Sequence, residues 1–265
     1  MSAAAPRRVS SAQVFGALLA RDLVVARREL VSFLLRSALQ PLLFTVVFGY
    51  LLPKMGFVSR GYTAAILPGV LGVTLALSSL QAVSLPMVVD FGWSKEIEDR
   101  LLAPIPIELV AIEKVFAGVL QGVVAALFVL PVARLIMGPI PGLSVAHFGI
   151  VLAVTLLGSA SFSALGLLLG TAIPPQHIGL MFSVIVTPMI MFGCAYYPWR
   201  SLAVVPVMQA AVLLNPLVYV SEGLRAALTP ALPHMPLPLV LAAMAALTLG
   251  FGLLGLRAFV RRAVA

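Results

Sequence analysis

Residues that could carry out catalysis are few in this sequence and stand far apart. Its 265 residues include nine Asp or Glu, three His and one Cys. The histidines, His147, His177 and His234, are scattered near the ends of apolar stretches, away from Cys194. The phosphate-binding motif Gly-x-x-x-x-Gly-Lys-Ser/Thr does not occur in the sequence. If the protein uses ATP, the nucleotide would therefore have to bind to a separate subunit. We expect no catalytic residue, no metal site and no cofactor bound by this chain.

Glu222 and Arg225 are the charged residues whose spacing predicts a specific contact. Three positions apart on a helix, a carboxylate and a guanidinium can pair, which makes it less costly to place both in a partly dehydrated segment. The favoured interpretation is structural, a pair that holds neighbouring segments together. Direct contact with a substrate is the alternative.

A charged segment at residues 92–114, GWSKEIEDRLLAPIPIELVAIEK, has the pattern of a stiff amphipathic turn. Ser94 can cap a short helix, Glu96 and Arg100 can brace it at i, i+4, and the prolines that follow end it. An apolar ridge and an acidic rim would come from Ile97, Leu101 and Leu102, and from Glu98 and Asp99. Such a turn suits the groove of a partner protein, although a plain charged loop would explain the same residues.

The composition indicates that the elements that position these residues are membrane-spanning helices. Apolar residues make up 62% of the chain and charged residues 10%, with a mean hydropathy of +1.13. A soluble domain is about half apolar and a quarter charged. Several apolar runs exceed the roughly 20 residues that a helix needs to cross a bilayer, and none alternates with period two. The sequence therefore predicts an all-α integral membrane protein.

We expect one membrane domain over residues 1–265, with six crossings. A polar, basic tail at 1–12 precedes an amphipathic helix at 13–30, which is predicted to lie in the membrane interface. The crossings are expected at 32–52, 63–91, 115–137, 147–170, 178–196 and 237–259. Residues 197–236 are too polar and proline-rich for a simple crossing, and they predict two short outer helices that dip back into the membrane.

The distribution of basic residues predicts the orientation. Of the 17 Lys and Arg residues, twelve precede or open the first span, lie between the second and third, or end the chain. The positive-inside rule then places both termini in the cytoplasm. The net charge of +8 is explained by residues that flank spans, so we expect no nucleic-acid partner.

Three motifs give the chain a resemblance to the permeases of the ABC-2 type transporter family. The 92–114 segment resembles the family's cytoplasmic coupling segment, an acidic turn that ends in Leu-Leu and proline. Tyr-Tyr-Pro at 196–198 matches the aromatic-proline position that closes the fifth span. NPLVYVSEGLR at 215–225 resembles the motif before the last span. The resemblance covers nearly the whole chain, and the short first outer loop is similar to that of small drug, polyketide and polysaccharide exporters.

The resemblance implies the permease subunit of an ATP-driven exporter in the bacterial cytoplasmic (inner) membrane. Two copies of an ABC ATPase subunit would bind ATP and Mg²⁺ and clamp onto the coupling turns. A second permease protomer, identical or related, would complete the transporter within the lipid bilayer. The residues that would contact the ATPase are Ile97, Glu98, Asp99, Leu101, Leu102 and Pro104.

Two further sets of residues are candidates for the transport route. The predicted outer gate consists of Tyr197, Asn215, Pro216, Tyr219, Glu222 and Arg225. The predicted substrate pathway consists of Phe44, Phe182, Thr187, Met189 and Phe192. Methionine and aromatic side chains suit a lipophilic or variable cargo, although ordinary helix packing would use the same residues. That the first and fifth spans line the route is implied by the resemblance alone.

Two other classes of protein fit the sequence less well. An ion-gradient-driven secondary transporter usually places a carboxylate near mid-bilayer, and no predicted mid-span stretch contains Asp or Glu. An intramembrane enzyme needs paired carboxylates, metal-binding histidines or a nucleophile with a base, which the predicted spans lack.

Overall fold

The computed structural model describes residues 11–28, 30–59, 61–94, 105–140, 142–144 and 146–264. Within these ranges every regular element is a helix, which confirms the predicted all-α fold. The α-helices are α1 (Ser11–Arg28), α2 (Leu30–Phe44), α3 (Leu52–Lys54), α4 (Tyr62–Val89), α6 (Ile107–Met137), α7 (Phe148–Ala172), α8 (Ile178–Met181), α9 (Thr187–Met191), α10 (Pro206–Ala211), α11 (Pro216–Leu228) and α12 (Leu237–Val264). The π-helical segments are η1 (Thr45–Leu51), η2 (Asp90–Ser94) and η4 (Phe182–Val186), and the 3₁₀ segments are η3 (Pro175–His177), η5 (Trp199–Val204) and η6 (Val212–Leu214).

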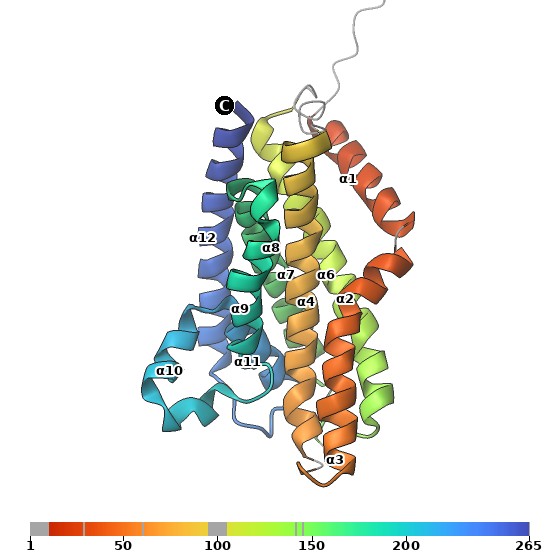
Figure 1. Cartoon of the computed structure of the whole chain (residues 1–265), viewed down its shortest axis with the longest axis vertical. Coiled ribbons are helices and arrows are strands. Elements are labelled where there is room, and N and C mark those ends of the chain that lie inside the picture. The colour runs from red at the N-terminus through yellow and green to blue at the C-terminus, as the bar shows by residue number, and fades with distance from the viewer. Residues whose placement is uncertain are drawn as a thin grey trace, which may run out of the picture.

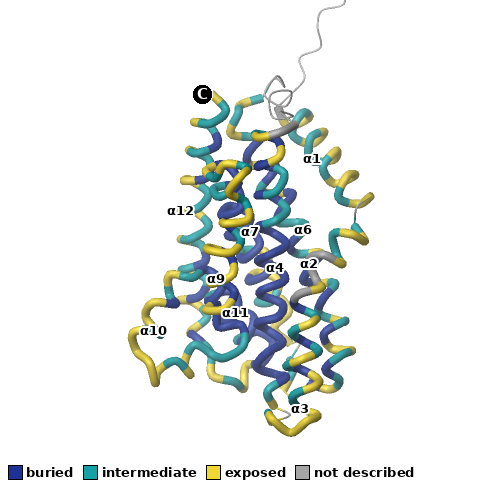
Figure 2. Tube along the Cα trace, in the orientation of Figure 1, coloured by how far each residue is buried: buried dark blue, intermediate teal, exposed yellow. Residues whose placement is uncertain are grey.

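Helix α4 forms the centre of the bundle. Its 28 residues are apolar on every face, as expected for a helix surrounded by other helices, and most of them are buried. It packs against both α6 and α7, and α7 packs in turn against α12 (Figure 1). Figure 2 shows the buried column along α4 and a second buried region at α11.

Among the described residues, four helices are long and apolar enough to cross a membrane, and they coincide with the second, third, fourth and sixth predicted crossings. The predicted first and fifth crossings contain only shorter apolar helices, Pro41–Lys54 and Pro175–Met191. Both stretches are nevertheless helical without interruption, from 30 to 54 through η1 and from 175 to 191 through η4, and each contains a π-helical segment. Pro41 lies just before η1, and Pro188 follows η4. The count of six crossings therefore remains a prediction.

The two ends of the bundle differ (Figure 1). We call the end at which α12 finishes the terminal end, and the end that carries α10 and α11 the hairpin end. At the hairpin end, helix Pro206–Leu214 meets helix Pro216–Leu228 at an angle of 99°. Counting this bent pair as one span would raise the number of candidate spans to five.

The observed helices differ from the predicted segments mainly at their ends. The predicted interfacial helix at 13–30 corresponds to α1, and the predicted third crossing at 115–137 begins earlier, at Ile107. Pro106 has extended backbone at the N-cap, which places the start of α6 directly after it. Most of the 1–12 tail and residues 95–104 of the coupling segment lie outside the described residues.

Candidate functional site at the hairpin end

Glu222 and Arg225 form an ion pair on α11 that is fully buried in the protein. The guanidinium Nη1 of Arg225 donates to Oε1 of Glu222, and neither side chain is exposed. A buried charge is costly unless it is paired and hydrogen-bonded. The other hydrogen bonds of Glu222 and Arg225 therefore show which segments the ion pair connects.

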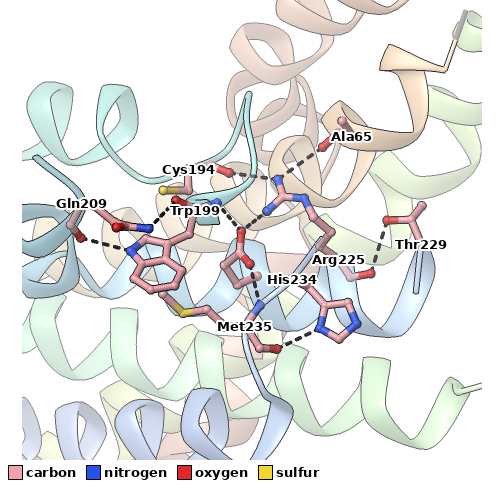
Figure 3. Close-up of polar contacts among 9 residues, drawn as sticks. Ala65, Cys194, Trp199, Gln209, Arg225, Thr229, His234 and Met235 are labelled. Atoms are coloured by element: carbon pink, nitrogen blue, oxygen red, sulfur yellow. Dashed lines mark hydrogen bonds and ion pairs between the residues drawn. The ribbon is translucent and has the colours of Figure 1, made fainter. Parts of the chain in front are cut away.

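The Glu222 carboxylate collects backbone N–H groups from two other segments. Its Oε1 accepts from the Trp199 amide at 2.9 Å, at the start of η5, and its Oε2 accepts from the Met235 amide at 2.8 Å, just before α12 (Figure 3). Both carboxylate oxygens are therefore satisfied by donors of the chain itself. Neither donor residue was among the predicted gate residues, because a backbone amide leaves no signal in side-chain chemistry.

The Arg225 guanidinium reaches in another direction. Its Nη2 donates to the carbonyl oxygens of Cys194 at 3.0 Å and Ala65 at 3.3 Å, the latter near the start of α4. Cys194 has a φ of 52°, in the left-handed region that non-glycine residues rarely adopt. The hydrogen bond to its carbonyl contributes to holding this turn in place. The ion pair thus joins α11 to α4, to the turn after α9, to η5 and to the segment before α12.

The turn at 193–195 also contacts two helices by close backbone packing. A Cβ added at Gly69 of α4 would lie 1.7 Å from the carbonyl oxygen of Ala195. A Cβ added at Gly193 would lie 2.3 Å from Cδ2 of Leu217 on α11. Only glycine permits the approach at Gly69 without displacement of the neighbouring backbone, whereas at Gly193 the Leu217 side chain would have to move. The Tyr62 hydroxyl donates to the next carbonyl, that of Tyr196, at 3.2 Å.

The other predicted gate residues fasten the bend between α10 and α11. Asn215 caps α11 by accepting from the Leu217 amide at 2.9 Å, and its Nδ2 donates to the carbonyl of Met189 at 2.7 Å. Pro216 occupies the first turn of the helix, where its missing N–H does no harm. The Tyr219 hydroxyl donates to the Leu213 carbonyl at 2.7 Å. Tyr197 lies nearby but makes only a long contact, 3.5 Å, to the Met191 carbonyl.

An apolar pocket of about 490 Å³ lies between the helical segment of η4 and α9, the α10–α11 bend and α12. A volume of this size falls in the range of small-molecule sites. Its walls are Leu165, Val184, Ile185, Pro188, Met189, Phe192, Met208, Ala211, Val212, Leu214, Asn215, Pro216 and Phe251. Two of the predicted pathway residues, Met189 and Phe192, therefore line one pocket.

The remaining predicted pathway residues do not line this pocket. Phe44 stacks on Tyr196 with ring centroids 5.1 Å apart, and on Phe48 at 5.6 Å. Thr187 turns its hydroxyl to the Phe182 carbonyl at 3.0 Å, which satisfies a backbone group in η4. Of the five predicted pathway residues, Met189 and Phe192 line this pocket, and Phe44, Phe182 and Thr187 do not.

The predicted coupling residues, Ile97, Glu98, Asp99, Leu101, Leu102 and Pro104, lie outside the described residues. The chain just before them is anchored at the terminal end. The Phe91 and Phe259 rings meet edge to face with their centroids 5.6 Å apart. The Arg262 guanidinium lies 4.7 Å from the centroid of the Phe91 ring. Arg262 also donates to the Thr171 carbonyl at the end of α7. In the described part of the chain, no three His, Cys, Asp or Glu side chains gather as a metal site would require.

A protein-family model described as ABC-2 type transporter matches residues 13–229, which cover the described helices from Gln13 of α1 to the end of α11. A search of curated proteins finds no match to this chain.

Proposed function

We propose, from the premise that this chain belongs to the ABC-2 type transporter family, that it is the membrane subunit of an ATP-driven exporter. The cargo is a hydrophobic, lipid-linked or drug-like molecule that leaves the cell across the bacterial inner membrane. The observation that carries this proposal is the family match over residues 13–229. The four long apolar helices support a multi-pass membrane protein.

In this proposal the terminal end lies in the cytoplasm and the hairpin end faces outward. The excess of Lys and Arg near both termini supports that orientation. The helical segments that contain η1 and η4 complete the six crossings, α1 lies in the membrane interface, and α10 and α11 re-enter the membrane from outside. A second permease protomer, identical or related, completes the transporter.

ATP and Mg²⁺ are bound by two copies of a separate ABC ATPase subunit, which contact the 92–114 segment. A push on that segment reaches α4 and α6 directly, because it connects them. Helix α4 then carries the displacement through the bundle to Ala65, whose carbonyl accepts from Arg225. The contacts of Ala65 and Gly69 support α4 as the mechanical link between the ATPase and the outer gate.

The buried ion pair holds the outer gate together rather than contacting cargo. Both of its side chains are fully buried, and both Glu222 oxygens already accept hydrogen bonds from the chain. A cargo molecule would have to displace these partners to reach either charge. The apolar pocket beside Met189 and Phe192 is the better cargo site, because methionine adapts to variable apolar shapes.

An ion-gradient-driven transporter is the alternative function. The observation in its favour is Glu113 of α6, which is fully buried, since a buried intramembrane carboxylate is the usual ion ligand. Its position argues the other way. Glu113 lies only six residues after Ile107, about 9 Å along the helix, near the terminal end rather than mid-bilayer.

Gentle detergent purification of the tagged protein from its own host, followed by mass spectrometry, tests the proposal. We expect a stoichiometric ATPase subunit that is lost when Ile97, Glu98 and Leu102 are replaced together by Ala. The matched control replaces Val204, Val207 and Leu214, three strongly exposed residues of the hairpin end. It should keep the ATPase. A stable protein that never carries an ATPase would favour the gradient-driven alternative.

A further inference from the structure

A second, smaller groove lies where the first two helices meet α6. It holds about 190 Å³ and lies at the junction of the end of α1, the start of α2 and the middle of α6. Its walls are Leu23, Ala26, Arg27, Leu30, Phe33, Leu120, Gln121 and Val124. The groove is narrow and almost entirely apolar, with one cation and one amide among its walls.

A buried ion pair fixes α1 beside this groove. Lys114 Nζ of α6 contacts Asp22 Oδ2 of α1 at 2.7 Å, with side chains 7% and 14% exposed. Lys114 stands seven residues before Gln121, or about two helical turns, so this pair lies along the same edge of α6 as the groove. Asp22 is the one acidic residue in the described part of α1, and it is already paired with Lys114.

Arg27 and Gln121 are therefore the polar groups left at the groove. Neither forms an ion pair or a hydrogen bond with any residue in the described ranges. Arg27 is exposed and Gln121 is half-buried, and the groove walls contain no carboxylate. An apolar groove with a guanidinium among its walls matches an amphiphile with one negative head group and a hydrocarbon chain.

The surroundings identify the source of that amphiphile. Val24 of α1, next to the groove residue Leu23, is 51% exposed, so the apolar surface of the groove continues onto the outer face of the helix and suits contact with hydrocarbon. The groove has less than half the volume of the pocket at the hairpin end, which suits one acyl chain rather than a bulky cargo. An exposed Arg near a membrane surface attracts anionic lipid head groups.

We propose that this groove binds an anionic phospholipid. One acyl chain lies between α1 and α6, the phosphate pairs with Arg27, and the Gln121 amide donates to the ester region. The bound lipid bridges the α1–α2 junction to α6 and so fixes the angle at which the first crossing enters the membrane. The site requires only that the chain spans a bilayer, and it is independent of the exporter's cargo and of its ATPase.

Native mass spectrometry of the purified full chain, titrated with phosphatidylglycerol or phosphatidylcholine in detergent, tests the proposal. The wild type should retain phosphatidylglycerol about fivefold more tightly than phosphatidylcholine, the ratio expected for one added cation contact. Arg27→Gln should abolish that preference. Arg28→Gln is the matched control, because it removes an identical charge from the same helical turn without touching the groove. It should leave the preference intact.

A second variant tests the hydrocarbon half of the site. Val124 is 41% exposed at the groove, so Val124→Trp can fill the channel without disturbing the core, and it should weaken retention of both lipids at least fivefold. Equal losses in Arg27→Gln and Arg28→Gln would show diffuse surface attraction and overturn the proposal. Unchanged retention in Val124→Trp, or preferential retention of a free fatty acid over phosphatidylglycerol, would overturn it as well.

Discussion

The buried Glu222–Arg225 pair allows a quantitative prediction about the stability of the hairpin end. Arg225→Met removes the counter-charge and leaves the Glu222 carboxylate with only the amides of Trp199 and Met235. Glu222→Gln does the reverse, since it leaves the guanidinium facing two carbonyl oxygens. Both substitutions keep much of the side-chain volume, so loss of charge compensation is the main change in each.

The expected magnitudes follow from burial. Removing one member of a buried ion pair destabilises a protein by about 3–5 kcal/mol, because the other charge remains buried without a partner. Each single variant should lose that much free energy of unfolding. The double variant contains no buried charge and loses mainly hydrogen bonds, about 1–3 kcal/mol in total. The single effects sum to about 6–10 kcal/mol, so the coupling energy should reach about 3 kcal/mol or more.

The assay is a double-mutant cycle on the free energy of unfolding in lipid nanodiscs or mixed micelles. Arg200→Met is the matched control, because it removes an exposed arginine at the same end of the bundle. It should change stability by less than about 0.5 kcal/mol. If the Glu222 and Arg225 effects are additive, or if each single change is as mild as the control, the pair does not hold the hairpin end together.

Three further variants test other contacts. Gly69→Ala should destabilise the protein by about 1–3 kcal/mol or prevent folding, measured by thermal unfolding, because the new methyl group would overlap the Ala195 backbone. Ala211→Trp should fill the apolar pocket and reduce cargo efflux from cells about tenfold or more, whereas Val207→Trp, 83% exposed and outside the pocket, should not. Asp22→Asn should remove the carboxylate that pairs with Lys114 of α6. The free energy that holds α1 against α6 should fall by about 1–3 kcal/mol, which faster hydrogen exchange in α1 would show.

The sequence predicted those helices that appear in it as long, uninterrupted apolar runs. Long apolar runs bounded by charges or prolines located α4, α6, α7 and α12 within a few residues, apart from the early start of α6. The spacing of Glu222 and Arg225 predicted that they can pair, and the structure places them together. These features depend on local spacing along one helix, which a sequence displays directly.

Features that depend on the path of the chain were not predictable. The π-helical segments η1 and η4 were not predicted, because a one-residue change in the backbone hydrogen-bond pattern leaves no signal in the hydrophobic pattern. The partners of the ion pair are backbone atoms of Cys194, Trp199 and Met235, which any residue type would supply. The Asp22–Lys114 contact joins residues 92 positions apart, so nothing in the local pattern announces it.

The central claim, that a separate ATPase docks on the 92–114 segment, is tested most directly by cross-linking in intact membranes. Glu98→Cys would carry a maleimide–benzophenone probe, and the native Cys194 should stay unlabelled because it is fully buried. Met55→Cys, 65% exposed at the hairpin end, is the control. The account predicts a covalent adduct between the Glu98→Cys chain and a nucleotide-binding ATPase, and none from Met55→Cys. An ATPase adduct at Met55→Cys, or none at Glu98→Cys in membranes that contain the ATPase, would contradict it.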